Sequence, residues 1–403
     1  MKYTYDFLKD MPKTDLHLHL DGSLRVESLI DMAKKINIEL PSYDPQGLKD
    51  TVFKDKYQNL GEYLKGFKYT CDVLRDLENL ERASYELAID NQNEDVNYIE
   101  VRFAPQLLMN PAKNIGMKEI LHRVNDGLLR AKKEYNQKKD KGLEFDYGII
   151  CCAMRMFNEK FSPYYSDIFK LMPNQKPAYV ISNTAMELTT GAIKLRDEEG
   201  LPIVGIDLAG EEAGYPAVNF KDSYELAHRN FLNKTVHAGE AYGAESIFQA
   251  ITDCYADRIG HGYSLFDSEL IVHPKIKDKK KYIQNLASFI ADKRITIEVC
   301  LTSNLQTNPD LKDIKDHHFK DMLENRMATT ICTDNRLVSN TTVTDEYKLA
   351  TDNFDIPVKI LKDIVAYGFK KSFHSGSYVE KREYAKRAMN YFDEVAKKHN
   401  ISL

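Results

Sequence analysis

Eight short apolar segments recur along this chain, and a longer stretch with helical residue spacing follows most of them. The apolar segments cover residues 14–20, 96–104, 147–155, 202–210, 234–240, 257–263, 294–304 and 327–335. Intervening stretches such as 77–95 and 222–233 repeat apolar residues with a period near 3.6, which predicts helices. Nearly continuous apolar strands that alternate with helices predict a parallel sheet with both faces covered.

Eight such units favour a (β/α)8 barrel of the α/β class over an open doubly wound sheet. A barrel also accounts for the whole length of 403 residues, and no linker rich in proline, glycine or serine divides the chain. The segment after residue 341 is expected to form helices that close the outside of the barrel. We therefore expect one barrel domain over residues 1–403.

The composition is that of an ordinary globular protein, with 43% hydrophobic and 29% charged residues. The formal net charge is -5 and the isoelectric point is near 6.2. Basic residues are interspersed with acidic ones, which argues against nucleic acid as the main partner. The lysine-rich segments 132–142 and 275–282 are interpreted as solvated loops or helix faces.

Localisation signals and cysteines point to a cytoplasmic protein. The N-terminal MKYTYDFLKDMPK lacks the apolar core of a secretory signal, and no run of eighteen apolar residues predicts a membrane span. The cysteines form no CxxC pair, and four of them lie in apolar, strand-like segments, so we expect buried, reduced thiols. The sequence carries no readable signature of an oligomeric state.

The first apolar segment, TDLHLHL at 14–20, contains two histidines one residue apart. Side chains alternate between the two faces of a strand, so His17 and His19 are expected to point to the same face. Two buried imidazoles on one face both need polar partners. A shared metal ion would satisfy both of them.

Other predicted strands also carry polar residues near their carboxyl ends, namely His237, His261 and Asp334. Taken singly, each has an ordinary interpretation, because a lone histidine can be a hydrogen-bonded core residue and a strand-end aspartate can cap a helix. In a (β/α)8 barrel, however, the carboxyl ends of all strands meet at one mouth. Three imidazoles and a carboxylate at that mouth would suit one catalytic Zn²⁺ ion.

Hydrolysis at such a site requires a nucleophile, an acid and a base. A zinc ion lowers the pKa of a bound water molecule from ~15.7 to about 7. Glu240 follows His237 by three residues and is the candidate acid, while His261 is the candidate base.

These residues and their flanking motifs resemble the adenosine deaminases of the metal-dependent hydrolase superfamily. The motifs occur in order over nearly the whole chain and read DLHLHLDGSL, EVRFAPQLL, DLAGEE, TVHAGE, RIGHGY, CLTSN and CTDN. The resemblance implies a zinc-dependent enzyme of purine salvage that converts adenosine, and also 2′-deoxyadenosine, to inosine-type products and ammonia. Its partner would be a small purine nucleoside, with neither nucleic acid nor a membrane involved.

The resemblance also implies roles for individual residues. The implied zinc ligands are His17, His19, His237 and Asp334. Glu240 matches the residue that protonates N1 of the purine, which makes C6 electrophilic. His261 matches the residue that orients the attacking water and helps to deprotonate it, assisted by Asp334.

The implied substrate-binding residues are His19, Asp21, Gly210 and Asn335. Gly210 matches a backbone N–H that contacts N3, and Asp21 matches a carboxylate that binds a ribose hydroxyl and would disfavour a 5′-phosphate. Asn335 stands where many family members have a second aspartate near N7, and its amide can donate at any pH. Residues 59–67, NLGEYLKGF, resemble a lid helix, although an ordinary amphipathic helix fits them equally well.

Three other functions stay open at this stage. A deaminase of adenine or of another 6-aminopurine nucleoside, such as aminodeoxyfutalosine, would use the same catalytic residues. A two-metal amidase or phosphoesterase generally needs a bridging carboxylated lysine or an equivalent near mid-chain, and segment 202–210 contains none. A non-catalytic binding protein would be expected to have lost Glu240 or His261, and both are present.

Overall fold

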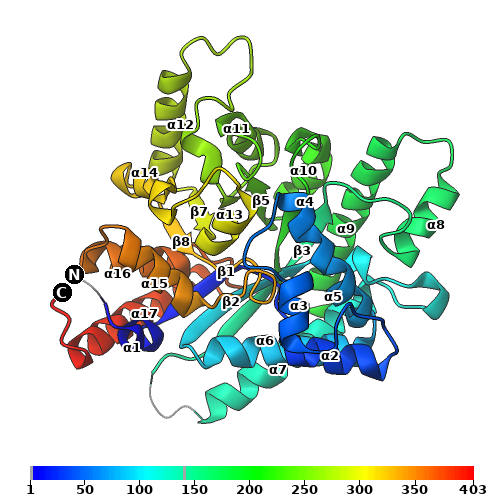
Figure 1. The fold of residues 1–403 in the computed structure, drawn as a ribbon, viewed down its shortest axis with the longest axis horizontal. Coiled ribbons are helices and arrows are strands. Elements are labelled where there is room, and N and C mark those ends of the chain that lie inside the picture. Colours follow the sequence, from blue (N-terminus) through cyan, green and yellow to red (C-terminus); the bar gives the residue numbers. More distant parts are fainter. Residues whose placement is uncertain (1–2, 139–141) are drawn as a thin grey trace.

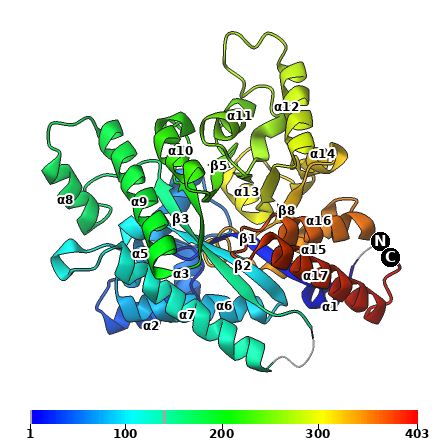
Figure 2. The ribbon, with the colours of Figure 1, turned by 180° about the vertical axis from the view of Figure 1, so that it is seen from behind.

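A computed structural model describes residues 3–138 and 142–403. Its centre is a nearly closed barrel of eight parallel strands with helices around the outside (Figures 1 and 2). Residues 139–141 of the lysine-rich segment 132–142 lie outside the described part of the chain. No helix within the described ranges is long and apolar enough to cross a membrane.

The strands lie close to the eight segments that the sequence predicted, and each pairs with the next in order from β1 to β8. They are β1 (Lys13–His19), β2 (Val96–Phe103), β3 (Asp146–Met154), β4 (Ile203–Ala209), β5 (Asn233–Ala238), β6 (Arg258–His261), β7 (Thr296–Val299) and β8 (Thr329–Ile331). Every residue of β1, β2, β4, β6, β7 and β8 is buried, as expected for a parallel sheet covered on both faces. The prediction of a (β/α)8 barrel is therefore confirmed.

The two edges of the sheet meet where the chain after β8 pairs with β1. The backbone N–H of His19 donates to the carbonyl of Asp334, and the N–H of Asp334 donates to the carbonyl of His17, each at 2.8 Å. A parallel bridge between Leu18 and Asp334 marks the same contact. These bonds close the barrel and fix Asp334 beside the two histidines of β1.

Helices cover the barrel, and the predicted helices 77–95 and 222–233 are present as α6 and α10. The helices are α1 (Tyr5–Asp10), α2 (Val26–Lys35), α3 (Pro45–Thr51), α4 (Leu60–Tyr63), α5 (Phe67–Leu74), α6 (Leu77–Gln92), α7 (Met117–Lys138), α8 (Pro163–Leu171), α9 (Pro177–Glu199), α10 (Lys221–Arg229), α11 (Ala244–Asp253), α12 (Lys279–Lys293), α13 (Leu301–Thr307), α14 (Phe319–Glu324), α15 (Val343–Asn353), α16 (Val358–Lys371) and α17 (Tyr378–Lys398). The tail after residue 341 is helical as predicted, with α16 against β1 and β8 and α17 against α16.

Several strands end earlier than the sequence predicted, for backbone reasons. Gly239, His261 and Asp334 have φ of 76°, 63° and 62°, in the left-handed region, so the chain leaves the sheet at these residues after β5, β6 and β8. The predicted strand 294–304 is also too long, because its end forms helix α13. The cysteines are confirmed as buried and free, and they are Cys71, Cys151, Cys152, Cys254, Cys300 and Cys332.

Candidate functional site

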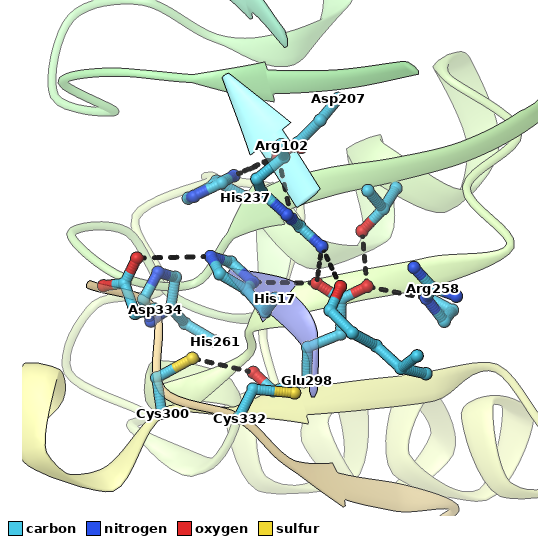
Figure 3. Close-up of polar contacts among 12 residues, drawn as sticks. His17, Arg102, Asp207, His237, Arg258, His261, Glu298, Cys300, Cys332 and Asp334 are labelled. Atoms are coloured by element: carbon cyan, nitrogen blue, oxygen red, sulfur yellow. Dashed lines mark hydrogen bonds and ion pairs between the residues drawn. The ribbon is translucent and has the colours of Figure 1, made fainter. Parts of the chain in front are cut away.

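Polar side chains from distant parts of the sequence meet at the carboxyl ends of the strands. Four buried residues each offer one ligand atom, and these atoms lie within 4.8 Å of one another: His17, His237, His261 and Asp334. The side chains of this group point toward a common centre (Figure 3). His19 reaches the same place, with its Nε2 atom 3.2 Å from Nε2 of His237 and 3.5 Å from Oδ1 of Asp334.

Two buried carboxylates orient two of these imidazoles. Glu298 lies 2.8 Å from Nδ1 of His17, and Asp207 lies 3.0 Å from Nδ1 of His237. Each carboxylate accepts a hydrogen bond from Nδ1–H, so the Nε2 lone pair of each ring faces the centre, as in metal-bound histidines. Nε2 of His17 is buried without a hydrogen-bond partner among the described residues, and Asp334 is 3.5 Å away. The missing partner of His17 is what a metal ion would supply.

Arginines keep these supporting carboxylates ionised. Arg102 pairs with Asp207 at 2.8 Å and with Glu298 at 2.9 Å, and Arg258 pairs with Glu298 at 2.6 Å. Burial alone would raise the pKa of both carboxyls. His237 and Arg102 instead hold the pKa of Asp207 well below its usual value, and Arg102 and Arg258 do the same for Glu298.

Most protonation states of the cluster suit a divalent cation, although, against the effects of burial and Arg102, Asp334 and Glu298 raise the pKa of His17. Burial lowers the pKa of His19, His237 and His261, so these rings are neutral at pH 7 and offer lone pairs. Burial opposes ionisation of Asp334, but the imidazole of His17, 3.5 Å away, lowers the pKa of that carboxyl far below its usual value. The Ser303 hydroxyl also donates to Oδ2 of Asp334 at 2.6 Å. Neutral imidazoles and an ionised carboxylate are the donor set that Zn²⁺ prefers.

Glu240 lies at the edge of this cluster, in the turn after β5. Its side chain is buried, and Oε1 is 3.8 Å from Nε2 of His261. Burial raises the pKa of Glu240 to about 8, with further contributions from the negative charges of Asp334 and Glu212. This carboxyl group is therefore protonated at neutral pH and can act as an acid.

The turn that carries Glu240 is held by a second glutamate. The carboxylate of Glu212 accepts hydrogen bonds at 2.7–3.0 Å from the backbone N–H groups of residues 239, 240, 241 and 242. The hydroxyl of Ser246 donates to the same carboxylate. This arrangement fixes the position of Glu240 relative to the histidines.

Two of the predicted substrate-binding residues lie beside the cluster: Asp21, whose Oδ1 atom is 3.9 Å from Nδ1 of His19, and Asn335, which follows Asp334. Asp21 is buried, and its Oδ1 atom has no hydrogen-bond partner within the described ranges. Burial raises the pKa of Asp21 to about 7. Gly210 has φ of +98°, a conformation that disfavours any other residue, and an added Cβ would lie 3.3 Å from Cε of Met154.

Asn335 connects the site to the predicted lid segment 59–67. Its Nδ2 atom donates to the hydroxyl of Tyr63 at 2.7 Å, and this hydroxyl is 2.8 Å from Oγ of Ser339. Tyr63 is the last residue of α4 and is buried. The segment therefore reaches the mouth of the barrel through Tyr63, and its movement as a lid stays a prediction.

The sequence predicted that five side chains meet at one mouth of the barrel, namely His17, His19, His237, His261 and Asp334. It did not predict the residues that support them. Glu298, Asp207 and Glu212 were not singled out, although each lies in or next to a predicted strand. A charged residue inside a buried, apolar strand is itself unusual, and Glu298 and Asp207 both carry that signal.

Comparison with known proteins identifies the family. The sequence profile described as adenosine deaminase matches residues 12–386, which is most of the chain. The chain belongs to the adenosine deaminase family. As a member of this family it is a hydrolytic deaminase.

Named adenosine deaminases are similar to this family member over most of its length. The adenosine deaminase of Clostridium botulinum (strain Kyoto / Type A2) is 34% identical over 372 residues, covering 91% of this chain and 94% of the relative. The probable adenosine deaminase of Dictyostelium discoideum is 30% identical over 371 residues. That match covers 92% of this chain but only 41% of the Dictyostelium protein, so the chain spans less than half of that relative.

Solved structures of low sequence identity share the fold of this adenosine deaminase family member. An amidohydrolase from Burkholderia ambifaria with bound Zn superposes with a TM-score of 0.77 at 16% identity, covering 99% of this chain and 96% of the other. The Arabidopsis protein ADAL complexed with IMP has a TM-score of 0.73 at 22% identity, covering 98% and 99%.

Proposed function

We propose that this enzyme hydrolyses the 6-amino group of adenosine and 2′-deoxyadenosine, which gives inosine or 2′-deoxyinosine and ammonia, with one zinc ion per chain. The observation that carries this proposal is the buried cluster of histidines and Asp334 beside Glu240, a carboxyl group that keeps its proton at neutral pH. The relatives named adenosine deaminase support the substrate, and the zinc-bound amidohydrolase supports the metal.

The zinc ligands in this proposal are His17, His19, His237 and Asp334. When bound, the ion would supply a water molecule that loses a proton near neutral pH. Glu298 and Asp207 serve the site by holding His17 and His237 with Nε2 toward the centre. Among the residues that the structure describes, no second group of three or more potential metal ligands accompanies this cluster.

The protein side chains move the protons of the reaction. Glu240 gives its proton to N1 of the purine, which draws electrons from the ring and makes C6 electrophilic. His261 and Asp334 border the path of the attacking water, orient it and take its proton between them. The water oxygen bonds to C6, and the proton taken from the water passes to the amino nitrogen, which leaves as ammonia when its bond to C6 breaks. The proton from Glu240 stays on N1 of the product, and the remaining proton of the water oxygen goes to Glu240 as the C6 carbonyl forms.

Three residues would hold the nucleoside. The backbone N–H of Gly210 would contact N3, the amide of Asn335 would donate to N7, and Asp21 would bind a ribose hydroxyl. The backbone of Gly210 adopts a conformation suited to glycine, so the ring can approach it closely. The carboxyl of Asp21 would repel a 5′-phosphate, so we propose that nucleosides react faster than AMP.

A panel of 6-aminopurines tests this function. Ammonia release is measured with adenosine, 2′-deoxyadenosine, adenine, AMP and aminodeoxyfutalosine, before and after removal of metal by a chelator, and after return of zinc. We expect the highest kcat/KM with the two adenosine nucleosides, loss of turnover on chelation, and recovery with zinc. Faster turnover of adenine or aminodeoxyfutalosine would make that compound the substrate instead. Turnover that survives chelation would contradict the proposed need for zinc.

A further inference from the structure

A chain of three buried hydrogen bonds leads from helix α14 to His261. The backbone N–H of Phe319 donates to Nδ1 of His317 at 2.9 Å. Nε2 of His317 lies 3.1 Å from Oδ1 of Asn304, and Nδ2 of Asn304 lies 3.1 Å from Nδ1 of His261. Phe319 begins α14, so its N–H has no partner within that helix and uses the histidine instead. All four residues are at most 1% exposed.

The backbone amide of Phe319 fixes the direction of every bond in this chain, because it can only donate. A neutral imidazole carries one proton, so His317 accepts at Nδ1 and must carry its proton on Nε2. Burial, with a smaller contribution from His318, lowers the pKa of His317 to about 3, so the ring stays neutral near pH 7. Nε2–H of His317 then donates to the oxygen of Asn304, which turns the Asn304 NH2 group toward His261.

The flipped orientation of the Asn304 amide can be excluded because the backbone N–H of Phe319 can only donate. If Asn304 presented its oxygen to His261, its NH2 group would face Nε2 of His317. His317 would then have to carry its proton on Nδ1, where the N–H of Phe319 approaches within 2.9 Å. Two donors would face each other in a buried site without water to separate them.

We propose that His317 and Asn304 are positioning residues that fix His261 as a hydrogen-bond donor at Nε2, the nitrogen that faces Glu240. A protonated Nε2 has no lone pair for a metal ion, although His261 lies within reach of the cluster. His19 is then the third imidazole ligand beside His17 and His237. This inference rests on the proposed function and makes it more specific.

A proton on Nε2 of His261 implies different roles for His261 and Asp334 toward the attacking water. His261 donates a hydrogen bond to the water oxygen and so orients its lone pair toward C6. The proton of the water passes to the carboxylate of Asp334, which Ser303 holds in place. His261 therefore acts by orientation, and Asp334 is the proton acceptor.

The tautomer of His261 can be measured without turnover. Protein labelled with ¹⁵N in its histidines is loaded with zinc, and the ring nitrogens are observed in long-range ¹H–¹⁵N correlation spectra. The His261 signals are assigned by their loss in His261→Gln. We expect an unprotonated Nδ1 and a protonated Nε2. A proton on Nδ1, or an Nε2 bound to zinc, would overturn the inference, whether or not adenosine proves to be the substrate.

Kinetics of paired variants test the role of His317. His317→Phe removes the donor but keeps a ring beside Tyr263, whose centroid is 4.9 Å from that of His317, and His317→Gln keeps an N–H donor toward Asn304. We expect His317→Phe to lower kcat by about 10–100-fold, with a KM change below about threefold and full zinc content, and His317→Gln to recover most of kcat. A wild-type kcat in His317→Phe, or equal losses of kcat in His317→Phe and His317→Gln, would contradict a positioning role of this chain of hydrogen bonds.

Two further variants complete the test. His318→Phe is the matched control, because His318 packs near the same Tyr263 ring and pairs with Asp321, and it should keep wild-type kcat. In Asn304→Asp the new carboxylate has nearly the same shape as the amide, but when ionised it can only accept hydrogen bonds. The substitution should therefore move the His261 proton to Nδ1. An unchanged His261 tautomer in folded Asn304→Asp would overturn the proposal, even if His317→Phe fails to fold.

Discussion

The carboxylate of Glu298 and the imidazole of His17 form a fully buried hydrogen bond of 2.8 Å between β7 and β1. Glu298 also pairs with Arg102 and Arg258, and its second oxygen accepts from Thr235 at 3.0 Å. A single side chain thus joins the charge network inside the barrel to one of the proposed zinc ligands. The orientation of the His17 imidazole, with Nε2 toward the centre of the cluster, depends on this contact.

Glu298→Gln should weaken zinc binding by about 10–100-fold, because the neutral amide is a poorer acceptor for Nδ1–H of His17. It should also lower the free energy of unfolding by about 3 kcal/mol, since two buried arginines lose one of their carboxylates. Zinc affinity from competition with a chelator and urea unfolding measure the two effects.

Glu100→Gln is the matched control for that variant. Glu100 pairs with Arg258, and within the described part of the chain it makes no hydrogen bond or ion pair with His17 or another proposed ligand. It should lower the stability and leave the zinc affinity within about threefold of wild type, since only partners of the ligands tune the metal. Equal loss of zinc affinity in both variants would show that Glu298 acts through stability alone.

Glu240→Gln should lower kcat by about 10²–10⁴-fold, because the amide cannot give a proton to the purine. Gln has nearly the same shape as protonated Glu240, so zinc content and melting temperature should stay close to those of wild type. Steady-state kinetics and metal analysis of the same preparation check both expectations. Turnover of Glu240→Gln at the wild-type rate would show that Glu240 is not the acid.

Much of the fold was predictable because its strands are buried on both faces. Such strands are nearly continuous apolar segments, and eight of them in alternation with helices leave few topologies other than the barrel. The exact strand ends were not predictable. The segment CLTSN continues an apolar run, which predicts a strand, yet Leu301–Thr307 form helix α13, because periodicity cannot separate short apolar helices from strands.

The site was predictable only in part. The barrel rule brings residues at strand ends together, so His17, His237 and Asp334 could be placed at one mouth from sequence. The supporting contacts depend on register between strands and on loop paths. Tyr63 and Asn335 are 272 residues apart in sequence, and no local pattern indicates that they share a hydrogen bond.

Asp21→Ala should lower kcat/KM for adenosine by about 10–100-fold, because the ribose loses a hydrogen bond to a buried carboxyl group. The kcat/KM for adenine, which has no ribose, should change little. The ratio of the two values, measured with one preparation, isolates the ribose contact from any loss of stability. An unchanged ratio would show that Asp21 does not bind the sugar.

Glu346→Gln should make the protein less sensitive to alkaline pH. Glu346 is fully buried, which raises its pKa from 4.5 to about 7, and it accepts hydrogen bonds from Thr302 and Thr341. The folded state therefore holds this proton more tightly than the unfolded state. The stability from that proton is complete below pH 4.5 and is lost as the pH rises through 7.

Because glutamine cannot lose a proton, the stability of Glu346→Gln relative to wild type should rise by about 2 kcal/mol between pH 5 and pH 8. Urea unfolding at both pH values measures the difference. The amide can still accept from the backbone N–H of Thr302 and donate to Oγ1 of Thr341. Parallel pH dependences of the two proteins would contradict a raised pKa of Glu346.

The most direct test of the account is a crystal structure of the zinc-loaded enzyme with anomalous scattering data collected on both sides of the zinc edge. We predict one zinc peak per chain at the mouth of the barrel, bonded to His17, His19, His237 and Asp334, with His261 outside the bonded set. Two peaks, a peak elsewhere, or a bond from zinc to His261 in place of His19 would contradict it.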